Sequence, residues 1–287
     1  MKFFQKAICA AAVACAFIGN ASAGEVVLHD WQFNPTGSLN TADRTEIGEF
    51  LDVVGSGFIQ LTKTGGSGFT FTEHATFIVK GHDGEGLDFA GGNVTAMFEA
   101  TGSGTFGTGF SFAGGTIKMY QNPGAGAYGS TSGIYGANLG TLIASFDVQA
   151  GGGGQVDASG QPISNGQITV LAKADVGDLV ANRFYDKNGV DLATSQLLSF
   201  AFTNASTTTN PSANLIKEVG CDFSGFAGAC NGKANYHNVP GDHFFIGGNG
   251  QFKLAQNVNV VPEPGSLALF GLAMLGAGVI SRKRKQA

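Results

Sequence analysis

The chain has 287 residues, with 46 glycines, 24 phenylalanines and only 7 prolines, and its formal net charge is −5. This many aromatic residues exclude a disordered chain, and this much glycine excludes a mainly helical one. Of the 16 basic residues, two lie near the N-terminus and four near the C-terminus, so residues 24–261 hold 10 basic and 20 acidic residues, a net charge of −10. A region this acidic repels nucleic acid, so we expect no nucleic-acid partner.

The first 23 residues have the three parts of a secretory signal peptide. Lys2 and Lys6 are followed by an apolar run over 7–18, and the small residues at 21–23 form a pattern that signal peptidase cleaves. An apolar run of about 12 residues is too short to cross the roughly 30 Å hydrocarbon core of a membrane. We therefore predict cleavage between Ala23 and Gly24 and an exported mature protein, rather than a buried N-terminal helix.

Residues 24–260 contain about ten short runs in which apolar residues alternate with polar ones, separated by clusters of Gly, Asn, Asp and Ser. A helical period is not convincing anywhere, apart from a turn or two near 42–50. We predict a single all-β domain, an antiparallel β-sandwich of jelly-roll type. The glycine-rich segment 151–166 and the Thr/Asn-rich segment 203–214 are expected to be long loops inside this domain rather than domain linkers.

Two of the four cysteines, Cys221 and Cys230, lie in the mature region. An exported chain meets an oxidising compartment, so we predict that they form a disulfide that closes a small loop. A lone cysteine pair without nearby histidines is a poor zinc site.

The segment Asp186-Lys187-Asn188-Gly189-Val190-Asp191 has oxygen-bearing side chains around a glycine. Asp186, Asn188 and Asp191 are candidate ligands for Ca²⁺, although the closing glutamate of an EF-hand is absent. The same residues fit an Asn-Gly hairpin turn, which is the interpretation we favour. Calcium is thus the one cofactor that the sequence leaves open.

We nominate no catalytic residues and expect no enzyme. The dipeptides His82-Asp83 and Asp242-His243 would point their side chains to opposite faces of a strand. The chain shows no nucleophile elbow or phosphate loop in a suitable context, and no carboxylate pair for glycoside hydrolysis can be named. Sugar binding would need exposed aromatic rings, and the candidates are Trp31, Tyr120, Tyr128, Tyr135, Tyr185 and Tyr236, of which core packing explains Trp31 better.

The C-terminus has three parts in order: Pro262-Glu263-Pro264, an apolar stretch over 265–280, and Arg282-Lys283-Arg284-Lys285. A helix of the apolar stretch would span about 24 Å, short of the roughly 30 Å hydrocarbon core, and its glycines weaken it. We predict a short transmembrane helix that holds the chain transiently, with the basic cluster in the cytoplasm. A permanent membrane anchor is the alternative.

This order of parts over 261–287 resembles the sorting signals of the PEP-CTERM proteins, the substrates of exosortase. The resemblance implies that signal peptidase and exosortase process the chain at the inner membrane of a Gram-negative bacterium. It also implies delivery to the cell surface or extracellular matrix, in a bacterium that makes exopolysaccharide.

Four stretches of the mature chain resemble the flocculation-associated PEP-CTERM proteins. They are Asp30-Trp31-Gln32-Phe33-Asn34-Pro35, Glu49-Phe50-Leu51-Asp52, Gly68-Phe69-Thr70-Phe71-Thr72-Glu73 and Asp242-His243-Phe244-Phe245. The resemblance implies a non-enzymatic protein that promotes cell aggregation in association with exopolysaccharide, as in flocs and biofilms. The alternative is a secreted carbohydrate-binding module or carbohydrate-active enzyme.

Overall fold

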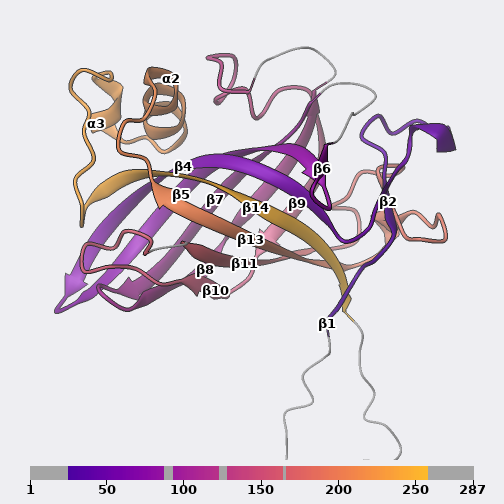
Figure 1. Cartoon of the computed structure of the whole chain (residues 1–287), viewed down its shortest axis with the longest axis horizontal. Coiled ribbons are helices and arrows are strands. Elements are labelled where there is room, and N and C mark those ends of the chain that lie inside the picture. Colours follow the sequence, from indigo (N-terminus) through magenta and orange to yellow (C-terminus); the bar gives the residue numbers. More distant parts are fainter. Residues whose placement is uncertain (1–24, 87–92, 123–127, 164–165, 258–287) are drawn as a thin grey trace, which may run out of the picture. The chain divides into compact units, whose positions relative to one another are not determined.

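A computed structural model describes residues 25–86, 93–122, 128–163 and 166–257 (Figure 1). Val27–Gln256 forms one compact unit. The predicted signal peptide with its cleavage site at Ala23 and Gly24, and the predicted sorting signal at 261–287, lie outside the described residues. Within the described ranges, none of the helices combines the length and the apolar character that crossing a membrane requires.

Strands dominate the fold, with short helical segments between some of them. The strands are β1 (Glu25–Val27), β2 (Trp31–Phe33), β3 (Thr45–Ile47), β4 (Phe50–Gly65), β5 (Gly68–His82), β6 (Glu85–Gly86), β7 (Asn93–Thr105), β8 (Gly109–Asn122), β9 (Thr141–Val148), β10 (Gly151–Gly154), β11 (Gln167–Ala174), β12 (Phe184–Tyr185), β13 (Leu197–Thr207) and β14 (His243–Asn257). The helical segments are η1 (Thr41–Asp43), η2 (Leu192–Thr194), α2 (Ala213–Leu215), the π-helix η3 (Ile216–Phe223) and α3 (Ala227–Cys230).

The main sheet runs in the order β14-β13-β11-β10-β8-β7-β5-β4, and β9 pairs with both β8 and β11. Neighbouring strands are antiparallel, as predicted. β14 also pairs with β4, in a register that runs from His243 opposite Gln60 to Lys253 opposite Phe50. The sheet therefore returns on itself, and its inner faces meet across one core as the facing sheets of a sandwich do. The prediction of an all-β antiparallel fold is confirmed.

Alternation along the strands separates the core from the outer surface. In β5, Phe69, Phe71 and Ala75 are buried, whereas Thr70 between them is exposed. The same inward face carries Glu73, which is also buried. The core is thus apolar with one acidic side chain among its inward positions on β5.

A helical segment covers part of the outer face of β4 and β14 (Figure 1). Phe58 of β4 and Phe245 of β14 point outward, with ring centroids 4.8 Å apart, and pack against Leu215, Ile216 and Val219. The side chain of Ser212 caps the start of this segment by accepting from the backbone N–H of Leu215. The predicted disulfide is present and joins Cys221 of η3 to Cys230 of α3.

The glycine-rich segment 151–166, which we expected to be a long loop, instead begins with a strand. Gly151–Gly154 forms β10, which lies between β8 and β11 and fills a gap in the sheet. Gly153 has φ +110°, and a Cβ there would lie 1.9 Å from the carbonyl oxygen of Phe110, so only glycine fits. The expected Thr/Asn-rich loop is also shorter than predicted, because β13 extends to Thr207.

A second, small sheet has the order β12-β2-β3. Trp31, Phe33 and Phe184 from its strands are fully buried, and the rings of Phe33 and Phe184 lie 5.1 Å apart. Trp31 therefore belongs to the core, as the sequence favoured, and is not a surface platform for sugars.

Candidate functional site

A polar pocket of about 350 Å³ lies on the surface beside the helical segment. It is formed where the end of β13, the turn before α2 and the loop before β14 meet. We call it the loop pocket, and its lining residues are Gln161, Thr207, Thr209, Asn210, Pro211, Ile216, Lys233, Tyr236, His237, Asn238 and Pro240.

Asn238 holds the loops of this pocket together. Its side-chain oxygen accepts from the backbone N–H of Phe245 at 3.1 Å and from the Tyr236 hydroxyl at 3.0 Å. Its side-chain nitrogen donates to the carbonyl oxygen of Thr208 at 2.8 Å. One amide side chain thus ties the loop before β14 to β14 itself and to the chain that follows β13, which fixes the shape of the pocket.

Tyr236 forms an aromatic part of the pocket wall. Its ring packs edge-on against Phe245, with centroids 5.1 Å apart, and its burial raises the pKa of the hydroxyl. The hydroxyl therefore stays protonated at neutral pH and keeps its hydrogen bond to Asn238. Because Phe245 holds the ring and Asn238 holds the hydroxyl, Tyr236 has a fixed position in the pocket wall.

The groups that reach solvent in the loop pocket are hydrogen-bonding and mostly uncharged. Thr209, Asn210, Lys233 and His237 are exposed, and Lys233 carries the formal positive charge. The lining contains no Asp or Glu, whereas glycoside hydrolysis needs two facing carboxylates. The pocket is therefore suited to binding a polar ligand such as a sugar.

The other aromatic candidates for sugar binding are placed differently. Tyr185 is buried. Tyr128 and Tyr135 pack edge-to-face with ring centroids 5.3 Å apart, and the Tyr128 hydroxyl donates to the carbonyl oxygen of Thr76 at 2.7 Å. These rings stabilise the chain that covers β5 and are not the open platforms that their glycine-rich surroundings suggested.

The histidine dipeptides also differ from expectation, because each histidine contacts its neighbour. His82 Nδ1 lies 3.0 Å from Asp83, and His243 Nδ1 lies 2.9 Å from Asp242. Asp83 has φ +51°, which takes it out of the strand geometry on which the prediction of opposite faces rested.

The Asp83 carboxylate is the centre of a backbone clamp. It accepts from the N–H groups of Gly48 at 2.6 Å, Glu49 at 2.7 Å and Phe50 at 3.0 Å. These hydrogen bonds and the one to His82 outweigh partial burial and lower the pKa of Asp83. The clamp joins the turn after β5 to the start of β4, so we assign it a structural role.

At the candidate calcium segment, both carboxylates bond to the backbone. Asp186 accepts from the N–H groups of Asn188 and Val190, each at 2.8 Å, and Gly189 adopts φ +80°. Asp191 accepts from the N–H groups of Asn182 at 2.7 Å and Ala193 at 2.9 Å. This geometry favours the hairpin turn. In the described ranges, no group of three or more His, Cys, Asp or Glu residues is placed to hold a metal ion. Calcium at these residues stays a prediction.

Of the residues that line the loop pocket, Tyr236 was predicted from the sequence as a candidate for sugar binding, and the others were not. Asn238, which organises it, lies among polar loop residues and has no periodic signal. Nothing in the sequence indicated that the loops lining this pocket meet.

Comparison with curated proteins and with solved structures finds no match to this chain. The model of the PEP-CTERM protein-sorting motif matches residues 260–285, which include Pro262-Glu263-Pro264 and the basic cluster. This motif marks an exported protein of Gram-negative bacteria that exosortase sorts. The chain is therefore a PEP-CTERM protein, exported with a C-terminal sorting signal.

Proposed function

We propose that the mature protein is a non-enzymatic component of the cell surface or extracellular matrix that promotes cell aggregation by binding exopolysaccharide. The observation that carries this proposal is the sorting motif at 260–285, because it marks the chain as an exported protein that exosortase sorts. A protein delivered there meets the polysaccharide that surrounds the cells.

The loop pocket supports the proposal with a suitable surface. Its amide, hydroxyl and imidazole groups match the hydroxyl groups of a sugar, and Tyr236 supplies an aromatic wall. Lys233 offers a cation to any acidic sugar in the polymer. The absence of carboxylates from the described lining favours binding over hydrolysis.

Deleting the gene and scoring flocculation of the producing bacterium tests the biological role. We expect the deletion strain to settle more slowly and to recover when the gene is restored. Normal flocculation without the protein would refute the role in aggregation.

Binding to the host's own exopolysaccharide tests the pocket. The triple variant N210A/K233A/H237A removes three exposed side chains, and we expect it to bind at least tenfold more weakly. The matched control K80A/K118A removes two exposed lysines from β5 and β8 and should bind like the wild type. Release of soluble sugar fragments by the wild-type protein would instead establish a carbohydrate-active enzyme.

A further inference from the structure

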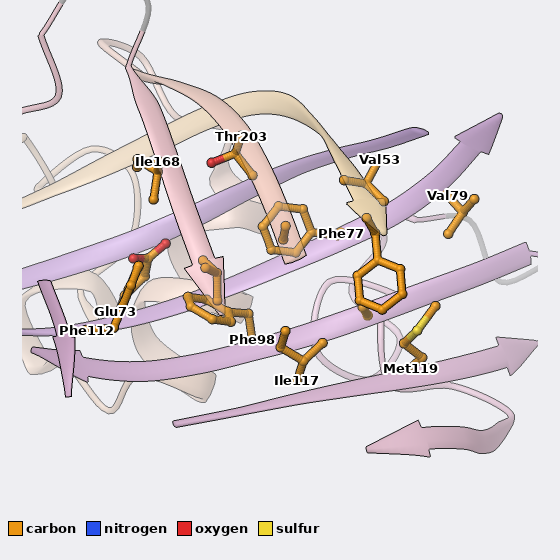
Figure 2. Close-up of a pocket in the computed structure, with 14 residues that line it drawn as sticks. Val53, Glu73, Phe77, Val79, Phe98, Phe112, Ile117, Met119, Ile168 and Thr203 are labelled. Atoms are coloured by element: carbon orange, nitrogen blue, oxygen red, sulfur yellow. The ribbon is translucent and has the colours of Figure 1, made fainter. Parts of the chain in front are cut away.

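A cavity lies inside the closed sheet, among side chains from β4, β5, β7, β8, β11, β13 and β14. Its volume is about 60 Å³. One water needs about 10–15 Å³ of such space, so the cavity has room for roughly four to six non-hydrogen atoms. Figure 2 shows its lining, in which apolar side chains such as Phe77, Phe98 and Met119 surround the space.

Glu73 is the acidic group in this lining, and Thr203 is the other polar residue (Figure 2). Alternation along β5 points Glu73 inward, where only 5% of the residue is exposed. It also lines a second, smaller space of about 20 Å³, so its carboxyl group borders both spaces. In the described part of the chain, the carboxyl group has no ion pair, and no hydrogen bond to it is seen.

A buried polar group without a partner is rare in native proteins, because its desolvation is not repaid. Burial in these apolar surroundings raises the pKa of Glu73 to about 7. Below that pH the group is a neutral acid that has one O–H to donate and needs an acceptor.

We propose that this interior cavity is a binding site for a small, neutral, apolar molecule with one acceptor oxygen, such as a ketone, ester or ether, whose oxygen accepts a hydrogen bond from protonated Glu73. The alkyl part of the ligand contacts the phenylalanine and aliphatic side chains. This site is separate from the loop pocket and does not depend on polysaccharide binding.

The lining decides between ligand classes. An ammonium ligand has three N–H donors, whereas the cavity offers only the Glu73 carboxyl and the Thr203 hydroxyl. An anionic ligand meets an acidic side chain, no lining cation and a mature region with a net charge of −10. A single acceptor oxygen is satisfied by the single O–H, so the neutral class fits.

The proton on Glu73 links binding to pH. With a pKa of about 7, roughly nine-tenths of the group is protonated at pH 6 and roughly one-tenth at pH 8. A ligand that needs this proton should therefore bind about tenfold more weakly at pH 8 than at pH 6.

The test uses 2-pentanone, which has six non-hydrogen atoms, and the protein as its host exports and processes it. Chemical-shift titrations at pH 6 and pH 8 should give the tenfold difference. Glu73→Gln keeps an N–H donor, so it should still bind but lose the dependence on pH. Glu99→Gln, an exposed acid on β7, should behave like the wild type. Ala201→Leu adds side-chain volume at the cavity wall and should abolish binding.

A second measurement remains decisive if Ala201→Leu fails to fold. The carbon signal of the Glu73 carboxyl group reports its titration, and 2-pentanone should raise its pKa because the ligand binds the protonated form. Absence of 2-pentanone binding, equal affinity at both pH values or an unchanged pKa would overturn the proposal. Tighter binding of n-pentylamine than of 2-pentanone would overturn the assigned ligand class.

Discussion

Replacing Glu73 by glutamine should make the protein more stable at neutral and alkaline pH. The carboxyl group titrates near its usual value of 4.5 when the chain is unfolded and at about 7 when it is folded. Above pH 4.5 the unfolded chain therefore releases a proton that the folded chain still holds. The part of the unfolding free energy that depends on protonated Glu73 is fully present below pH 4.5 and is lost as the pH rises through 7.

The size of this loss follows from the difference between the two pKa values. A difference of roughly 2.5 between the two pKa values corresponds to about 3 kcal/mol once the pH is well above 7. Glutamine has a similar shape and no charge, so Glu73→Gln should exceed the wild type in free energy of unfolding by up to about 3 kcal/mol at pH 8. For a domain of this size that is a rise in Tm of roughly 6–12 °C.

Urea denaturation of both proteins between pH 4 and pH 9 measures this difference. The two curves should meet below pH 4.5, separate between pH 5 and pH 7 and run nearly parallel by pH 8. Glu46→Gln provides the control, since Glu46 is exposed on β3 and should leave the pH profile unchanged. A constant difference between Glu73→Gln and the wild type across this range would refute the argument, because a packing change does not titrate.

Three further predictions rest on other parts of the chain. Asp83→Asn weakens the charged acceptor of three backbone N–H groups and should cost about 2 kcal/mol of unfolding free energy at pH 7. Since the pKa of Asp83 is lowered, urea titration should show this difference shrink as the pH falls below 3.8, and a constant difference would contradict the clamp. Replacing Cys221 and Cys230 by serine opens a loop with a separation of 9 residues and should cost about 2–3 kcal/mol, measured by urea denaturation without reductant. The intact mass of the exported protein should correspond to a chain without residues 1–23 and without the basic cluster. A mature protein that retains Arg282–Lys285 would instead support the alternative of a permanent membrane anchor.

The strands could be predicted because alternation is a local signal. Runs such as 69–72 place phenylalanine and threonine on opposite faces, and β5 follows that pattern. The closure of the sheet had no such signal. The pairing of β14 with β4 brings His243 opposite Gln60, and neither segment has a sequence pattern that predicts which strand it pairs with.

The helical segment at 213–223 was missed although the sequence contains its signal. Leu215, Ile216 and Val219 have the spacing of one helical face, and Ser212 precedes them as a capping residue. The Thr/Asn-rich stretch 203–214 before them was predicted to be a loop. Tertiary packing on Phe58 and Phe245, together with the disulfide, stabilises a short helix that local propensity alone would not.

Glu73 could also have been found from the sequence, since residues 69, 71, 73 and 75 share one face of a strand. The burial of Glu73 destabilises the folded protein at alkaline pH, so its position in the core indicates a functional role and not a stabilising one. About 3 kcal/mol lost at pH 8 is a large share of the 5–15 kcal/mol that holds a typical domain together. Leucine at this position would fill similar space without an unpaired oxygen, so Glu73→Leu should be more stable than the wild type at pH 8. The same variant lacks the O–H that we assign to ligand binding. Urea denaturation and 2-pentanone titration of Glu73→Leu should therefore show a gain in stability together with weaker binding, and unchanged binding would leave the acid without its proposed role.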